Sequence, residues 1–167
     1  DHLATLESES VLATYERSDG KFDEAIDRVN SILSRRRRKL GETHPATLDS
    51  MSQLAEIYLH KGGIAEALRM HQDVLALRQK HLGVDHPTTL ASLGSVATLY
   101  SVQGRLDDAI TLQKEAVEAT KQKLGALHPA TLSAMNSLAD TYGDSNQYED
   151  AISLLKEVLK LREQTLG

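Results

Sequence analysis

The sequence predicts an all-α fold in which pairs of helices stack into a solenoid, and three observations support this class. The pattern Leu-Gly-x-x-His-Pro-x-Thr-Leu occurs at residues 40–48, 82–90 and 124–132, so the chain repeats every 42 residues. A fixed period of roughly 20 to 50 residues is typical of stacked supersecondary units. Between the copies, apolar residues recur at helical spacing. Leu and Ala dominate these residues while aromatic residues make up only 4%, which is the composition of packed helices.

The period divides the chain into four units, at about residues 1–41, 42–83, 84–125 and 126–167, which we expect to form a single repeat domain. Residues 2–6 resemble the second half of the recurring pattern, and residues 166–167 match its first two positions. We therefore expect the four units to come from a longer array. Four units exceed the roughly three that a solenoid needs for independent stability.

The first helix of each unit is predicted to begin at a proline and to carry an apolar stripe. Pro45, Pro87 and Pro129 precede the stripe, where proline is tolerated because the N–H groups of a first turn lack intrahelical partners. The stripe residues lie three or four positions apart. They are Leu48, Met51, Leu54, Ala55 and Tyr58 in the second unit, Leu90, Leu93, Val96, Ala97 and Tyr100 in the third, and Leu132, Met135, Leu138, Ala139 and Tyr142 in the fourth.

A short turn and a second helix complete each unit. The predicted turns lie at Gly20, Gly62-Gly63, Gly104 and Asn146, residue types that accept the left-handed backbone with which helices often end. Every second helix then carries an alanine at one fixed place, at positions 25, 67, 109 and 151. A small side chain at a fixed place indicates close approach of two helices, because a larger one would hold them apart.

The first unit departs from this pattern. Glu9 stands where the other units have Met51, Leu93 and Met135, and Glu16 stands where they have Tyr58, Tyr100 and Tyr142. A terminal repeat has one neighbour, so we expect this helix either to be partly exposed or to have slipped its register so that Tyr15 faces inward. The alternative is that the two acids contact something outside this chain.

The residues assembled so far resemble the tetratricopeptide repeat. They are a Leu-Ala-x-x-Tyr first helix, as in Leu54-Ala55 to Tyr58, a glycine turn, and a second helix with Ala67-Leu68 or Ala109-Ile110. The 42-residue period resembles the subtype found in kinesin light chains and nephrocystin-like proteins, and in the C-terminal arrays of NB-ARC or NACHT signalling ATPases. The resemblance implies a right-handed α-α superhelical solenoid of tetratricopeptide helix pairs, with a groove lined by the first helices.

By this resemblance, one set of residues on the first helices would line the groove and bind a partner. These predicted groove residues are Glu7, Ser10, Thr14 and Arg17, then Asp49, Ser52, Glu56 and Leu59, then Ala91, Gly94, Thr98 and Ser101, then Ser133, Asn136, Asp140 and Gly143. Only Arg17 and Asn136 are of the types that clamp a peptide carboxylate. The acids outnumber Arg17 by three, so we expect a basic or polar partner.

The histidines and a basic run are two further features of the sequence that could form sites. His44, His86 and His128 occur once per unit, whereas zinc needs three or four ligands around one ion, so we interpret them as residues that form hydrogen bonds at helix starts and between units. We expect His60, His71 and His81 at the surface.

The run at residues 35–39 is Arg-Arg-Arg-Arg-Lys, and we expect a solvated helix end there, with a nuclear localisation signal or an anion site as alternatives. Arg35 is unusual because its counterparts Leu77, Ala119 and Leu161 are apolar.

No sequence motif indicates catalysis, a metal or a cofactor, and we expect no enzyme activity. The net charge of −5 disfavours nucleic acid as the main partner. No apolar run approaches the roughly 20 residues of a membrane helix. The chain has no Cys, which excludes disulfides and is compatible with a reducing compartment, so we expect a cytoplasmic protein.

The predicted function is a protein–protein interaction module that binds a peptide or protein partner in its groove. Two alternatives remain: a sensor or autoinhibitory arm of a larger NB-ARC or NACHT-type ATPase, and a kinesin light chain-like cargo adaptor. We also expect self-association through a terminal face, because Ile152, Leu155, Val158 and Leu159 lack a following unit.

Overall fold

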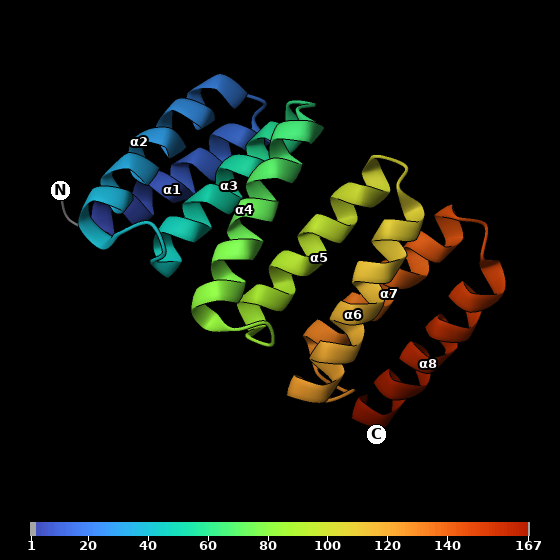
Figure 1. Cartoon of the computed structure of the whole chain (residues 1–167). Helices are drawn as coiled ribbons and strands as arrows, with labels where there is room; N and C mark the ends of the chain where they lie inside the picture. The colour runs from blue at the N-terminus through green and yellow to red at the C-terminus, as the bar shows by residue number, and fades with distance from the viewer. Residues whose placement is uncertain (1–2, 167) are drawn as a thin grey trace. The chain divides into compact units, whose positions relative to one another are not determined.

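A computed structural model describes residues 3–166 of the chain, with side chains described for residues 4–164. The described residues form eight helices and no strands (Figure 1). The helices are α1 (Leu3–Ser18), α2 (Phe22–Leu40), α3 (Pro45–His60), α4 (Ile64–Leu82), α5 (Pro87–Val102), α6 (Leu106–Leu124), α7 (Pro129–Asp144) and α8 (Tyr148–Leu166). The partial copies predicted at residues 2–6 and 166–167 include His2 and Gly167, which lie outside the described residues.

The chain forms two compact units, Asp1–His81 and Leu82–Gly167. In the first, α2 packs against both α1 and α3; in the second, α6 packs against both α5 and α7, and α8 packs against α7 (Figure 1). Within each unit, a second helix thus contacts its own first helix and the next one. This is the packing order of an all-α helical repeat solenoid, as the period predicted.

The helix starts are those predicted from the prolines. Helices α3, α5 and α7 begin at Pro45, Pro87 and Pro129. The histidine before each proline caps the helix: Nδ1 of His44 accepts the N–H of Ala46 at 3.2 Å, and the equivalent bonds of His86 and His128 measure 3.3 and 3.1 Å. These bonds satisfy N–H groups that a helix end otherwise leaves unpaired. The predicted role of the three histidines at helix starts is confirmed.

The predicted left-handed turn residues are also confirmed. Asn146 has φ 59°, and it follows α7 at the place where Gly104 follows α5 with φ 75°. After each of them the chain turns back on the helix, since the N–H of Gln147 donates to the carbonyl of Tyr142 at 2.8 Å and that of Arg105 to the carbonyl of Tyr100 at 2.9 Å. An asparagine tolerates this backbone better than other residues with a Cβ.

The core contains most of the predicted stripes and the fixed alanines. Tyr58, Leu93 and Tyr100 are only half-buried, whereas Ile57 and Leu99, which were not predicted, are buried. Leu48, Leu90 and Leu132 are buried at the start of each stripe. The alanines at positions 25, 67 and 109 are 0% exposed and the one at position 151 is 8% exposed, as expected for close helix approach. Small residues at these points let the helices of a pair pack without a gap.

Helix α1 keeps the register of the other first helices, so the predicted slip is wrong. Tyr15 is 69% exposed, while Leu6 and Ala13 are buried. Glu16 turns inward and accepts two hydrogen bonds from Arg28, from Nε at 2.8 Å and from Nη2 at 2.5 Å. Glu9 accepts from Nη1 of Arg35 at 2.7 Å. Both acids therefore have partners inside the chain, on α2.

The basic run at the end of α2 is partly structural, which corrects the expectation of a solvated helix end. Arg36 is 7% exposed, and its Nη1 donates to the carbonyl of Ala46 at 3.0 Å and to Oγ of Ser50 at 2.7 Å. A buried guanidinium that donates to α3 joins the two helices. The expectation for His71 was also wrong, since it is buried with 5% exposure, whereas His60 and His81 are exposed.

The apolar stripe predicted on the last helix is confirmed in part. Ile152, Leu155 and Leu159 are exposed, at 53%, 40% and 59%. Val158 is 2% exposed because it packs with Leu132 and Met135 of α7, so it does not belong to the exposed face. None of the helices, over the residues described, is long and apolar enough to cross a membrane.

Candidate functional site

The predicted groove residues all lie on the first helices, α1, α3, α5 and α7, and none of them is fully buried. The exposed members are Glu7, Thr14, Asp49, Glu56, Ala91, Thr98, Ser133 and Asp140, and the half-buried members are Ser10, Arg17, Ser52, Leu59, Gly94, Ser101, Asn136 and Gly143. The side chains therefore reach the surface, as a binding role requires. The two compact units differ in what surrounds these residues.

In the first unit, side chains bridge the space between α1 and α3. Nε2 of Gln53 donates to the carbonyl of Ser10 at 2.7 Å and to Oγ1 of Thr14 at 3.0 Å, while Oγ of Ser10 donates to Oε1 of Gln53 at 2.7 Å. Three groove-side hydrogen bonds thus converge on Gln53. Its role was missed because its counterparts in the other units, Ser95 and Ser137, are too short to reach across.

Two of the three predicted groove acids in the first unit, Asp49 and Glu56, pair with arginines. Nη2 of Arg78 lies 2.6 Å from Oδ1 of Asp49, and Nη1 of Arg17 lies 3.6 Å from Oε2 of Glu56. Arg78 is 8% exposed and comes from the second helix α4, so a prediction that considered only the first helices did not include it. The first unit is consequently less acidic than the sequence predicted.

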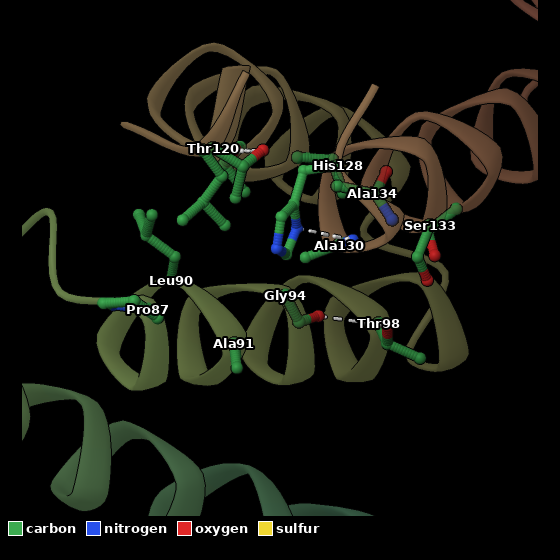
Figure 2. Close-up of a pocket in the computed structure, with 14 residues that line it drawn as sticks. Pro87, Leu90, Ala91, Gly94, Thr98, Thr120, His128, Ala130, Ser133 and Ala134 are labelled. Carbon is green, nitrogen blue, oxygen red and sulfur yellow. Dashed lines mark hydrogen bonds between the residues drawn. The ribbon is translucent and has the colours of Figure 1, made fainter. Parts of the chain in front are cut away.

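In the second unit, a pocket of about 410 Å³ opens between α5, α6 and α7 (Figure 2). We call it the α5–α7 pocket. Four predicted groove residues line it, namely Ala91, Gly94, Thr98 and Ser133. The space is left by small side chains: Gly94 has no Cβ, and a Cβ built there would meet no atom within 4 Å. In Figure 2, Ala91, Gly94 and Thr98 follow one another along α5, opposite Ala130, Ser133 and Ala134.

The base of the α5–α7 pocket comes from α6. Ala116 and Thr120 line it, and Oγ1 of Thr120 donates to the carbonyl of Ala116 at 2.8 Å, so the Thr120 hydroxyl has a partner within its own helix. Gln113 also lines it and is 4% exposed, yet its Oε1 has no hydrogen-bond partner. A buried acceptor without a donor is costly, which distinguishes Gln113 from the other residues that line the pocket.

A second hollow of about 260 Å³ adjoins this pocket, with Thr98, Gln113 and Ser137 as shared walls. Its other walls include Ser101, Asp140 and Asp144, and we call it the acidic hollow. Among the described residues, no Lys or Arg forms an ion pair with Asp140 or Asp144. These two carboxylates therefore have no basic partner within the described residues, unlike Asp49 and Glu56.

The site therefore combines an apolar cavity, the buried Oε1 of Gln113, and the carboxylates of Asp140 and Asp144, which have no basic partner within the described residues. Within residues 3–166, no three His, Asp or Glu side chains come together in a way that could hold a metal ion. Such a site suits recognition of another molecule through its surface and charge. Helix pairs stacked in this order define a helical repeat protein.

The comparison with family models gives the family directly. The model of the tetratricopeptide repeat matches residues 2–80, 53–122 and 88–164, which together span nearly the whole chain. The chain belongs to the tetratricopeptide repeat family. A search of curated protein sequences finds no match to this chain.

Solved structures support the same assignment. The chain is 25% identical to TPR-like repeats assigned to a kinesin light chain of Podosopora anserina, with a TM-score of 0.62, covering 99% of this chain and 98% of that one. A variant of those repeats with one glutamine replaced by methionine is 24% identical, with the same TM-score and coverage. BtubC (BKLC) from P. vanneervenii is 20% identical with a TM-score of 0.85, and this chain spans 63% of its length. The fold is that of the kinesin light chain-like repeats.

Proposed function

We propose that this chain is a protein-interaction module that holds a peptide or protein partner on the surface formed by its first helices. Tetratricopeptide repeats in general mediate protein–protein interaction, and the neighbouring structures fit that role. The observation that carries the proposal for this chain is the α5–α7 pocket, since an open, largely apolar cavity lies where four of the predicted groove residues meet. Cavities of roughly 300 to 1,000 Å³ with a few polar groups are typical binding sites.

A kinesin light chain-like cargo adaptor is the second candidate, and the likeness to the Podosopora anserina repeats favours it. Both candidates act by holding a partner and not by catalysis. They share the same binding surface, so the first experiment concerns that surface.

The experiment places a photo-crosslinking amino acid at single positions and exposes each variant to a cell extract. Ala91 and Ser133 are exposed positions that line the pocket, on α5 and α7. Thr111 on α6 and Lys156 on α8 are exposed positions that do not line it, and they serve as matched controls. We expect one protein to crosslink through Ala91 and Ser133 and not through the controls. A partner that crosslinks only through Thr111 or Lys156 would place binding on another surface.

A further inference from the structure

We propose that the α5–α7 pocket and the acidic hollow together bind one extended peptide segment, in which an apolar side chain is followed within two positions by Lys or Arg. This inference rests on the proposed function and adds the chemical class of the segment. Three features of the second unit carry it: the apolar cavity, the unpartnered amide oxygen of Gln113, and the two free carboxylates.

The α5–α7 pocket suits an apolar side chain. Its walls include Leu90, Ala91, Ala116 and Ala134, and the cavity of about 410 Å³ is large enough for a bulky aliphatic or aromatic group. A charged group would lose its hydration in such a place without gaining an ionic partner. The apolar residue of the segment is therefore expected here.

Gln113 supplies the hydrogen bond that fixes the segment. Its side chain is 4% exposed, lines both hollows, and has an Oε1 without a donor. The backbone N–H of an extended segment is such a donor, and extended peptides have N–H groups that no internal bond occupies. Because Gln113 lines both hollows, a segment that fills them passes along its amide, and a rotation of the buried side chain would bring Oε1 to one N–H while the flanking side chains enter the hollows.

The acidic hollow suits a cation. Asp140 and Asp144 line it, and within the described residues neither forms an ion pair with Lys or Arg. In an extended strand, residues two apart point to the same side and lie about 6 to 7 Å from each other. Because the two hollows share the walls Thr98, Gln113 and Ser137, an apolar residue and a basic residue one or two positions later can occupy both.

The first unit provides an internal comparison. Gln53, Ser10, Thr14 and Val29 lie two periods before Ser137, Gly94, Thr98 and Gln113. In the first unit, Gln53 crosses the space between the helices and the position equivalent to Gln113 is the apolar Val29, which is 0% exposed. In the second unit, the short Ser137 stands in place of Gln53, and the polar Gln113 stands in place of Val29. Substituting Ser137→Gln should therefore close the pocket, since the new amide can donate to the carbonyl of Gly94 and to Oγ1 of Thr98.

The test uses a random dodecapeptide library displayed on phage, selected on the full chain and then on variants. We expect the selected peptides to share an apolar residue followed within two positions by Lys or Arg. Ser137→Gln should weaken a synthetic selected peptide by about tenfold or more. Asp140→Asn with Asp144→Asn should weaken it by about fivefold and reduce its salt dependence. The control Ser153→Gln, at an exposed site on α8, should bind like the original chain.

Two further readouts separate the possible results. Circular dichroism melting of Ser137→Gln shows whether the variant is folded, and the carboxylate double variant, altered only at exposed sites, tests the charge contribution independently. Side-chain amide signals of Gln113 in nuclear magnetic resonance spectra should shift when the peptide binds. Selected peptides that are acidic, or that bind the Ser137→Gln and carboxylate variants as well as the original chain, would overturn this inference and leave the proposed function intact. If the library yields no peptide and Ala91 crosslinks no protein, the proposed function fails as well.

Discussion

Glu9 and Arg35 form an ion pair in the first repeat (residues 1–41), 2.7 Å between Oε2 and Nη1, at the positions where the second repeat (residues 42–83) has Met51 and Leu77. Met51 is buried and Leu77 packs against the same apolar cluster. The first repeat thus has a charged contact between its two helices where the second repeat has an apolar one. Glu16 and Arg28 show the same exchange elsewhere on this pair of helices, where the second repeat has Tyr58 and Met70.

This exchange predicts that substitutions of Glu9 and Arg35 are non-additive in a double-mutant cycle. Glu9→Met or Arg35→Leu alone leaves a partly buried charge without its partner and should cost about 1 to 3 kcal/mol of unfolding free energy. The double variant restores the apolar pair of the second repeat and should be neutral or more stable by about 1 kcal/mol, a modest gain because the side chains of Glu9 and Arg35 are partly exposed, at 27% and 19%. Urea unfolding followed by circular dichroism measures all four proteins. Additive single costs would show that the two residues do not interact.

Much of the fold was predictable because four copies of each position report on the same environment. The proline helix starts, the left-handed Asn146 and the fixed alanines recur in register, so each prediction rested on several residues. Glu9 and Arg35 stood out in the sequence as two separate exceptions. Their counterparts in the second repeat, Met51 and Leu77, are both apolar, and this would have indicated that the two charged residues face each other. In contrast, the glutamines at positions 53 and 113 are not repeated in the other units, so no pattern reported on them. The contacts of such a single side chain depend on its neighbours in space, which the sequence does not give.

The fixed alanines give a second prediction. Ala109 is 0% exposed on α6, so Ala109→Leu should overpack the helix contact and cost about 1 to 3 kcal/mol. Ala76 on α4 is exposed and provides the matched control, since Ala76→Leu should change the melting temperature little. Equal melting temperatures for Ala109→Leu and the original chain would show that the assigned helix contact is wrong.

His71 predicts how stability depends on pH. Burial, together with the nearby charge of Arg78, lowers the pKa of the imidazole below its ordinary value. The folded state therefore favours the neutral ring, while the unfolded chain takes up a proton at about pH 6.5. The contribution of His71 to the unfolding free energy is therefore fully present above about pH 6.5. It is lost as the pH falls from there toward the pKa of His71 in the folded state, which is lower. His71→Gln, which copies the residue at the equivalent position 113, should flatten the dependence between about pH 7 and 5 in urea unfolding. An unchanged slope would exclude His71 as its source.

The exposed apolar face of α8 predicts self-association of the isolated chain. Ile152, Leu155 and Leu159 present neighbouring apolar side chains to solvent, and such faces are covered by another surface when one is available. Sedimentation velocity should show a concentration-dependent increase in mass, which Ile152→Gln with Leu159→Gln abolishes. The same variants should leave the helix content unchanged, because neither side chain is buried. A monomer at all concentrations would contradict this prediction.

The binding surface itself is tested most directly by filling it. Ala91 is exposed on α5 and lines the α5–α7 pocket, so Ala91→Trp places an indole in the space that the partner is proposed to occupy. Thr111 is exposed on α6 and lines no part of the pocket, so Thr111→Trp adds the same group elsewhere. The measurement is the dissociation constant of each variant for the protein that crosslinks through Ala91 and Ser133, by isothermal titration calorimetry. We predict at least about a tenfold loss of affinity for Ala91→Trp and none for Thr111→Trp. Equal affinities for both variants would contradict binding at the first-helix surface.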